Sequence, residues 1–199
     1  SCVVAEDNPL ARQPPRPMGN RNAVYAEQFD WKTVFYDVYR VGEHIVFQGP
    51  PFENFLPLLR DDALFRGKFG WLWPRARLIE RNRASEIWLR DTADAVRLDG
   101  PLGRFAIDVQ PNLSHLFTGR RVIHTLSKNN DVRWISDWIT FYQSVHGADA
   151  VLLYDNNSTI YHPAELQAEL RTRFPDMTVI VVDWPFRYGP QGGLAGAVD

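Results

Sequence analysis

The C-terminal part of the chain alternates between apolar runs and polar segments in a regular order. Residues 122–126 form a short apolar run, and the polar residues 127–130 follow it. The next apolar residues recur every three or four positions, which predicts an amphipathic helix whose apolar stripe faces a core. This stripe consists of Trp134, Ile135, Trp138, Ile139, Phe141, Tyr142 and Val145. Asn130 or Asp131 is the expected N-cap of the helix, and Gly147 is its expected end.

The same alternation continues after this helix. A fully apolar run at residues 150–154 predicts a second strand, and Pro163 at a first helical position opens a second helix. The apolar side of that helix consists of Leu166, Leu170 and Phe174. Residues 177–182 predict a third strand. The order β-α-β-α-β is typical of a parallel, Rossmann-like sheet flanked by helices, and we assign residues 119–199 to this α/β domain.

Residues 24–118 show a different pattern, in which short apolar runs are separated by turn residues. Runs rich in β-branched and aromatic residues predict strands. The predicted strands cover residues 32–39, 44–47, 86–90, 95–98 and 104–109. We interpret residues 86–90 and 95–98 as an antiparallel pair. The pattern indicates a small β-rich accessory domain, whereas residues 1–23, which are rich in Pro, Arg and Asn, predict a disordered tail.

Composition and charge narrow the class of protein. The net charge of −2 gives no reason to expect a nucleic acid as partner. Because Cys2 is the only cysteine, no disulfide can form within the chain, and we predict a cytoplasmic location. No apolar run approaches the ~20 residues that span a bilayer, so no transmembrane segment is predicted, although association with a membrane surface stays open. The first residues lack a signal-peptide pattern, and the missing initiator Met indicates processing or a fragment.

Polar side chains follow each predicted strand of the α/β domain. They occupy residues 127–130, residues 155–158 and the segment from Asp183 onward. In an open parallel sheet, ligands bind beyond the carboxyl ends of the strands, so these segments predict a binding site. The candidate binding residues are Ser127, Lys128, Asn129, Asp155, Asn156, Asn157 and Ser158.

Several common ligand chemistries leave signatures that this sequence lacks. There is no G-x-G-x-x-G after the first strand and no Walker loop, which argues against dinucleotide-dependent dehydrogenases and P-loop enzymes. Zinc-type His/Cys spacing and a Gly-x-Ser-x-Gly elbow are also missing. Carboxylate and amide groups suit the base and ribose of a nucleotide, because a carboxylate can accept a hydrogen bond from a uracil N–H or a sugar hydroxyl. Asp155 is the leading candidate, and the alternative is a loop carboxylate that caps the following turn.

One block of the sequence carries a family resemblance. The block comprises Ser127-Lys128-Asn129-Asn130, Ser136-Asp137-Trp138-Ile139-Thr140-Phe141-Tyr142, Gly147 and Tyr154-Asp155-Asn156-Asn157-Ser158. It resembles the opening of a GT-A-type glycosyltransferase, and is most similar to glycosyltransferase family 92 and related bacterial polysaccharide-synthesis proteins. Trp184-Pro185-Phe186 and the residues after it resemble the segment that follows the family's third strand. The chain departs from the family pattern at Asn130, Asp137 and Gln143, where Glu, Glu and His are usual.

The resemblance implies a partial GT-A fold and inverting transfer of a sugar in glycan or polysaccharide synthesis. The donor would be a nucleotide-diphosphate sugar, possibly a UDP-sugar, and the acceptor a hydroxyl of a glycan or another molecule. Such a site also needs Mn²⁺ or Mg²⁺ on an Asp-x-Asp motif and a carboxylate base. No Asp-x-Asp occurs in the sequence. We therefore expect the complete enzyme to extend beyond Asp199, and assign no catalytic residue or metal ligand here. The alternative is a non-catalytic carbohydrate- or nucleotide-binding module.

Overall fold

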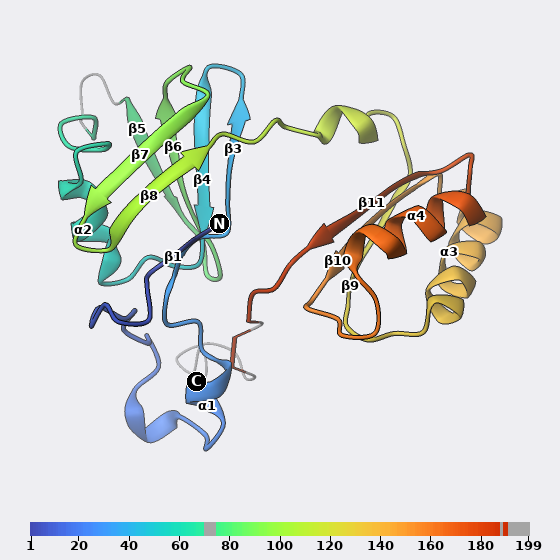
Figure 1. Ribbon diagram of the computed structural model, residues 1–199, viewed down its shortest axis with the longest axis horizontal. Helices are drawn as coiled ribbons and strands as arrows, with labels where there is room; N and C mark the ends of the chain where they lie inside the picture. Colours follow the sequence, from blue (N-terminus) through green and yellow to red (C-terminus); the bar gives the residue numbers. More distant parts are fainter. Residues whose placement is uncertain (70–74, 188, 191–199) are drawn as a thin grey trace, which may run out of the picture. The chain divides into compact units, whose positions relative to one another are not determined.

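The computed structural model describes residues 1–69, 75–187 and 189–190 of the chain. The chain divides into two compact units (Figure 1). Unit 1 contains residues 1–112 and continues with Arg187 after unit 2, and unit 2 contains residues 113–186. The division between Asn112 and Leu113 lies a few residues before the predicted start of the α/β domain at residue 119.

Unit 1 is built mainly from antiparallel strands. Its main sheet has the order β3-β4-β6-β5, with β3 at Asp37–Val41, β4 at His44–Gly49, β6 at Ser85–Arg90 and β5 at Ala76–Glu80. A hairpin of β7 (Ala95–Gly100) and β8 (Gly103–Asp108) forms a separate pair, as does β1 (Cys2–Val3) with β2 (Thr33–Phe35). The short helices are η1 (Met18–Asn20), α1 (Tyr25–Gln28) and α2 (Phe55–Asp61).

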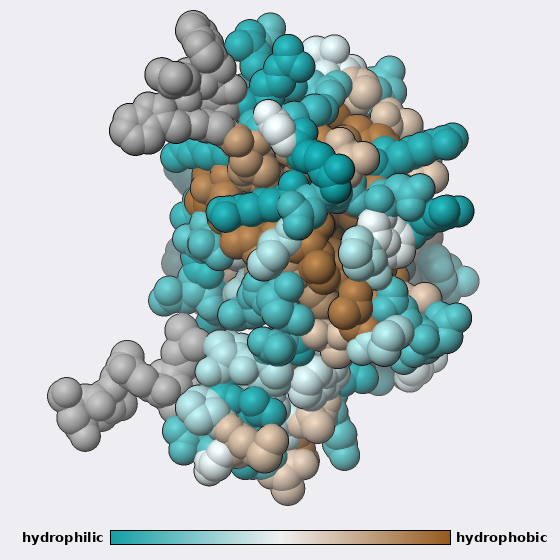
Figure 2. Space-filling view, turned by 90° about the vertical axis from the view of Figure 1, so that its left-hand side faces the viewer, coloured by the Kyte–Doolittle hydropathy of each residue, from teal (hydrophilic) through white to brown (hydrophobic). Residues whose placement is uncertain are grey.

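The core of unit 1 is rich in phenylalanine. Phe35, Phe47, Phe52 and Phe65 are fully buried, and their rings contact one another in tilted or edge-on arrangements with centroids 5.1–5.7 Å apart. Such edge-to-face pairs stabilise a core beyond the area that they bury. Figure 2 shows that apolar residues also reach the surface on one face, between hydrophilic ones. Phenylalanine therefore supplies several of the fully buried side chains of unit 1.

The strand pairing in unit 1 differs from the sequence prediction. The residues predicted as strands at 86–90 and 95–98 do form strands, but β6 pairs with β4 and β5, whereas β7 pairs with β8. The prediction was wrong because local propensity places strands along the chain but carries no information on non-local partners. The predicted strand at residues 32–39 is likewise divided into β2 and β3.

The first residues of the chain do not form the loose tail that their composition predicts. Strand β1 pairs with β2, and Cys2 and Val4 are buried in the core of unit 1. Arg12 is only 3% exposed. Its guanidinium donates hydrogen bonds to the carbonyls of Asp30 and Thr33 and lies 5.3 Å from the centre of the Phe55 ring. Packing of these few residues outweighs the disorder-prone Pro and Asn residues between them.

The buried Cys2 thiol should be chemically inert in the folded chain. Burial raises its pKa from 9.0 to about 11. Because the thiolate is the reactive form, this rise lowers the reactive fraction near pH 8, and burial adds a barrier to access. We expect a thiol-specific disulfide reagent to label the native chain on the order of 100-fold more slowly than the urea-unfolded chain. Equal rates in both states would show that the first residues are not packed.

Unit 2 is an α/β layer that confirms the predicted order of elements. It contains η2 (Ser114–Phe117), β9 (Val122–Ser127), α3 (Val132–His146), β10 (Ala150–Asp155), α4 (Pro163–Arg173) and β11 (Thr178–Asp183). The strands are parallel, in the order β11-β10-β9. Both helices cover one face of the sheet (Figure 1) and enclose a core that includes Ile139, Leu153 and Leu170. A mixed α/β chain with a parallel sheet is therefore established.

The ends of the helices follow from capping chemistry. The Asp131 side chain accepts a hydrogen bond from the Arg133 amide, and Gly147 ends α3 in the left-handed conformation at φ 64°. The Arg133 side chain also binds Asp131, and this hydrogen bond holds the pKa of that carboxyl below its usual value. His162 caps α4 and forms a capping box with Glu165. These ends confirm the positions predicted for Asp131, Gly147 and Pro163.

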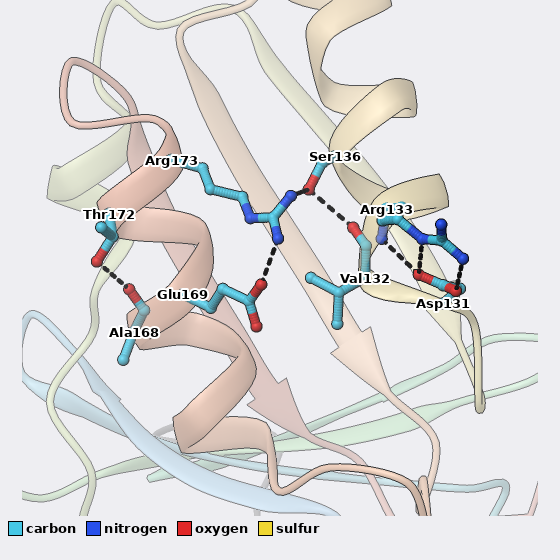
Figure 3. Close-up of polar contacts among 8 residues, drawn as sticks. All are labelled: Asp131, Val132, Arg133, Ser136, Ala168, Glu169, Thr172 and Arg173. Atoms are coloured by element: carbon cyan, nitrogen blue, oxygen red, sulfur yellow. Dashed lines mark hydrogen bonds and ion pairs between the residues drawn. The ribbon is translucent and has the colours of Figure 1, made fainter.

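A polar contact joins the two helices. Figure 3 shows Arg173 of α4 reaching Ser136 of α3, with a nitrogen–oxygen distance of 3.3 Å. The same guanidinium binds Glu169 one turn earlier on α4, at 2.5 Å. Ser136 in turn donates to the Val132 carbonyl at 2.7 Å. The contact therefore fixes the spacing of α3 and α4 at the polar border of their apolar interface.

The apolar face of α3 is only partly buried, contrary to the prediction of a single core-facing stripe. Ile135 and Ile139 are buried, but Trp134, Phe141 and Val145 are 68%, 52% and 59% exposed. On an α-helix the centre of these three exposed residues lies about 120° away from the centre of the two isoleucines. The sequence pattern does not separate these two adjacent stripes, because both consist of large apolar residues.

Candidate functional site

The carboxyl ends of the parallel strands bring three polar positions into one row. In the register of the sheet, Asp155 at the end of β10 lies between Ser127 of β9 and Asp183 of β11. The pairing continues one residue further, because the Asn156 amide donates to the Ser127 carbonyl at 2.7 Å and the Trp184 amide to the Asp155 carbonyl at 2.8 Å. The three polar segments singled out in the sequence are thus neighbours at one edge of the sheet.

Asp155 is the centre of a hydrogen-bond network that ties two of these segments together. Its carboxylate accepts from the Ser158 amide at 3.0 Å and from the Ser158 hydroxyl at 2.5 Å. The Ser158 hydroxyl oxygen accepts from the Asn129 amide at 2.8 Å, and the Asn129 side chain accepts from the Thr159 amide at 2.7 Å. The loops that follow β9 and β10 therefore form one connected unit.

The third segment is joined to the same network. Asn156 is 6% exposed, and its side-chain amide donates to the carbonyls of Trp184 and Phe186 at 2.9 and 2.7 Å. Ser127 is also buried and accepts from the Asn130 side chain at 2.8 Å. Because buried polar groups of this kind are satisfied within the protein, Ser127, Asp155 and Asn156 act as a framework for the loops.

Burial of Asp155 changes the role expected for it. The residue is 0% exposed, and Ser158 occupies both of its carboxylate oxygens. A carboxylate in this position cannot reach a ligand directly, so the structure favours the turn-capping alternative over the predicted contact to base or ribose. Asp155 positions the loops on which other residues are presented.

The exposed groups at this edge include Lys128, Asn129, Asn130, Asn157 and Asp183. Asn129 and Asn157 have the left-handed backbone conformation, with φ of 54° and 59°, which asparagine tolerates better than most residues. Among the residues that the structure describes, the side chains of Lys128 and Asp183 form no hydrogen bond or ion pair. One cation and one carboxylate are thus available to a ligand.

Asp183 and an aromatic cluster were missing from the candidate residues named in the sequence. The Tyr154 and Trp184 rings lie 5.5 Å apart and the Trp184 and Phe186 rings 4.8 Å apart, both edge-on. All three residues are partly exposed. The signal that could have found Asp183 is its place directly after an apolar strand of a parallel sheet, the position that also singled out Asp155.

Three further groups of residues lie away from this edge or outside the described part of the chain. Gln191, Gly192 and Gly193, where small residues could let the backbone approach the phosphates of a donor, lie outside the described residues. His124 is exposed on β9, although a histidine within an apolar strand predicts a buried side chain. Asp137 is exposed on α3.

A divalent metal does not fit the residues at this edge. Over residues 1–69, 75–187 and 189–190, no group of three or more His, Cys, Asp or Glu side chains is placed to hold a metal ion. Asp155, the carboxylate closest in register to Asp183, is buried and already engaged by Ser158. Mn²⁺ and Mg²⁺ need several oxygen ligands, so no step of a reaction is assigned to a metal here.

Comparison with known proteins adds no relative. No protein-family model matches the chain, and no curated protein or solved structure gives a significant match. Within the described part of the chain, none of the helices combines the length and apolar character needed to cross a membrane. The site therefore has to be interpreted from its own geometry.

Proposed function

We propose that the carboxyl edge of the unit 2 sheet binds the nucleotide part of a nucleotide-diphosphate sugar, as part of a glycosyltransferase. The reaction would be transfer of the sugar to a hydroxyl of a glycan or another acceptor. Binding of the nucleotide part is probed most simply with UDP. The observation that carries the proposal is the row of Ser127, Asp155 and Asp183, whose loops are joined by hydrogen bonds into one preformed edge. Because the loops are already ordered, less conformational entropy is lost when a ligand binds.

The exposed groups suit the parts of a nucleotide. Lys128 can pair with a phosphate, because an ammonium group is a compact point charge. Asp183 can accept hydrogen bonds from ribose hydroxyls or from a base N–H. Trp184 and Tyr154 offer aromatic surface, on which any base can stack. The resemblance of residues 154–158 to the Tyr-Asp-Asn-x-Ser motif of glycosyltransferases supports the same ligand class.

A thermal-shift measurement with UDP tests this proposal on the whole chain. We expect saturating UDP to raise the melting temperature by about 2 °C, because a ligand that binds only the folded state stabilises it. Since no metal ligands are assigned in this chain, the shift should be the same with and without Mn²⁺. Lys128→Ala should remove most of the shift, whereas Arg104→Ala, which removes an exposed cation of unit 1, should leave it unchanged.

Three results would count against the proposal. No shift with UDP or any other nucleotide would contradict nucleotide binding at this edge. A large shift that requires Mn²⁺ would contradict the prediction that the metal ligands lie outside this chain. A shift with free sugars but not with nucleotides would favour a carbohydrate-binding module instead.

A further inference from the structure

Helix α3 carries an apolar stripe that its own unit covers only in part. The stripe consists of Trp134, Trp138, Phe141 and Val145, and we call it the outer stripe of α3. Trp134, Phe141 and Val145 are more than half exposed, whereas Trp138 is partly exposed and also packs against the core of unit 2. Trp138 and Phe141 both contact the Tyr142 ring, with centroids 5.6 and 5.3 Å away. A contiguous exposed apolar surface of this kind marks an interaction site more often than isolated apolar residues do.

The spacing of the outer stripe is that of a helix–helix seam. Its members follow one another at intervals of four, three and four residues, the spacing of apolar positions in a coiled coil. This series reads the same in both directions. When two such helices lie antiparallel about a two-fold axis, Trp134 comes level with Val145 of the other copy, and Trp138 with Phe141. Each large ring then faces a different side chain, which allows the two surfaces to interlock.

The charges beside the stripe favour a second copy of this chain over a strongly charged partner. The hydrogen bond to Asp131 and, to a smaller extent, the nearby charge of Asp137 raise the pKa of Arg133, so this cation is matched by carboxylates on the same helix end. The flank of the stripe therefore carries no excess of positive charge. Unit 2 has six Lys and Arg residues against eight Asp and Glu residues within positions 113–186. This balance gives no attraction to an anionic lipid surface.

We propose that the outer stripe of α3 docks against the same stripe of a second copy of this chain, with the two helices antiparallel. A two-fold interface uses the same patch on both copies, which the palindromic spacing provides. Four side chains per copy make an interface smaller than the ~1,200 Å² of stable complexes, so the dimer should be weak and reversible. The proposal is independent of the nucleotide site.

Sedimentation of the full chain and of charge variants tests this pairing. We expect the unaltered chain to change from monomer to dimer as its concentration rises through the micromolar range that small interfaces reach. Trp134→Lys and Val145→Asp should each weaken dimerisation at least tenfold, because each places an unpaired charge in an apolar seam. Gln143→Lys, at an exposed position of α3 outside the stripe, serves as the control and should dimerise normally.

A mixture of the two variants gives the decisive result. In the antiparallel arrangement, the ammonium group introduced by Trp134→Lys would face the carboxylate introduced by Val145→Asp, while the second contact keeps the native Trp134 and Val145. The mixture should therefore dimerise more strongly than either variant alone, with circular dichroism confirming that both are folded. A chain that stays monomeric up to about 200 µM, a dimer that the stripe variants do not affect, or a mixture that fails to recover would each overturn the proposal.

Discussion

Replacing Asp155 with alanine is expected to lower the free energy of unfolding by about 3 kcal/mol. The substitution leaves the Ser158 amide and hydroxyl without their acceptor, and it removes a side chain that is completely buried. Buried donors without partners cost about 1–3 kcal/mol each. Because Ser158 also binds Asn129, both loops should loosen, and UDP binding should weaken roughly tenfold through loss of preorganisation.

Two related variants separate the parts of this effect. Asp155→Asn keeps the shape and one acceptor oxygen, so its loss of stability should be about half as large. Ser158→Ala removes the hydroxyl that joins Asp155 to Asn129 but leaves the Ser158 amide in place, and should cost about 1 kcal/mol. Urea denaturation followed by circular dichroism measures all three. If Asp155→Ala were as stable as the unaltered chain, Asp155 would not hold the loops together.

Replacing Arg12 with alanine should destabilise unit 1 by about 3–4 kcal/mol. The buried guanidinium satisfies the carbonyls of Asp30 and Thr33, and its plane packs near the Phe55 ring. Hydrogen bonds from a charged donor contribute about 1.5–3 kcal/mol each. The loss should appear as a lower urea midpoint and as faster labelling of Cys2, which lies in the same packed N-terminal segment.

Arg12→Met tests which part of the side chain matters. Methionine keeps much of the apolar stem but donates no hydrogen bond, so it should recover the packing contribution alone. Arg16→Ala is the matched control at a neighbouring arginine, because Arg16 is less buried and packs on the Tyr25 ring at 5.2 Å, and it should cost much less stability. Wild-type stability in Arg12→Ala would mean that the N-terminal segment contributes nothing to the fold.

Much of unit 2 could be predicted because its signals are local. Asp131 and Gly147 mark the ends of α3, and Pro163 marks the start of α4, through hydrogen bonds and backbone angles set by neighbouring residues. The apolar runs of β10 and β11 are continuous, as is typical of strands of a parallel sheet, whereas β9 is interrupted by the exposed His124. The right-handed crossover then allows few alternatives for the topology.

What could not be predicted depends on contacts between distant residues. The sequence near Asp155 does not reveal that Ser158 occupies its carboxylate, and so it favoured a ligand contact over a cap. The pairing of β6 with β4 depends on residues about forty positions apart. Arg12 is buried because it meets the carbonyls of Asp30 and Thr33, 18 and 21 residues further along the chain, which composition alone does not encode.

The candidate site accordingly has two layers, a buried one that holds the loops in place and an exposed one that can contact a ligand. An inner layer of Ser127, Asp155 and Asn156 is buried and satisfied within the protein. An outer layer that includes Lys128 and Asp183 is exposed and available to a ligand. Substitutions in the inner layer should lower stability and binding together, whereas substitutions of Lys128 or Asp183 should lower binding with little effect on stability. This separation distinguishes a binding edge from an ordinary set of loop turns.

Mapping the UDP contact by NMR shows directly whether the carboxyl edge of the unit 2 sheet binds a nucleotide. The amide resonances of the full chain are assigned and followed during titration with UDP. If the carboxyl edge of the unit 2 sheet binds the nucleotide, the largest shift changes fall at residues 127–130, 155–158 and 183–184. Changes concentrated at the amino ends of these strands or in unit 1, or no change at all, would show that the nucleotide does not bind at this edge.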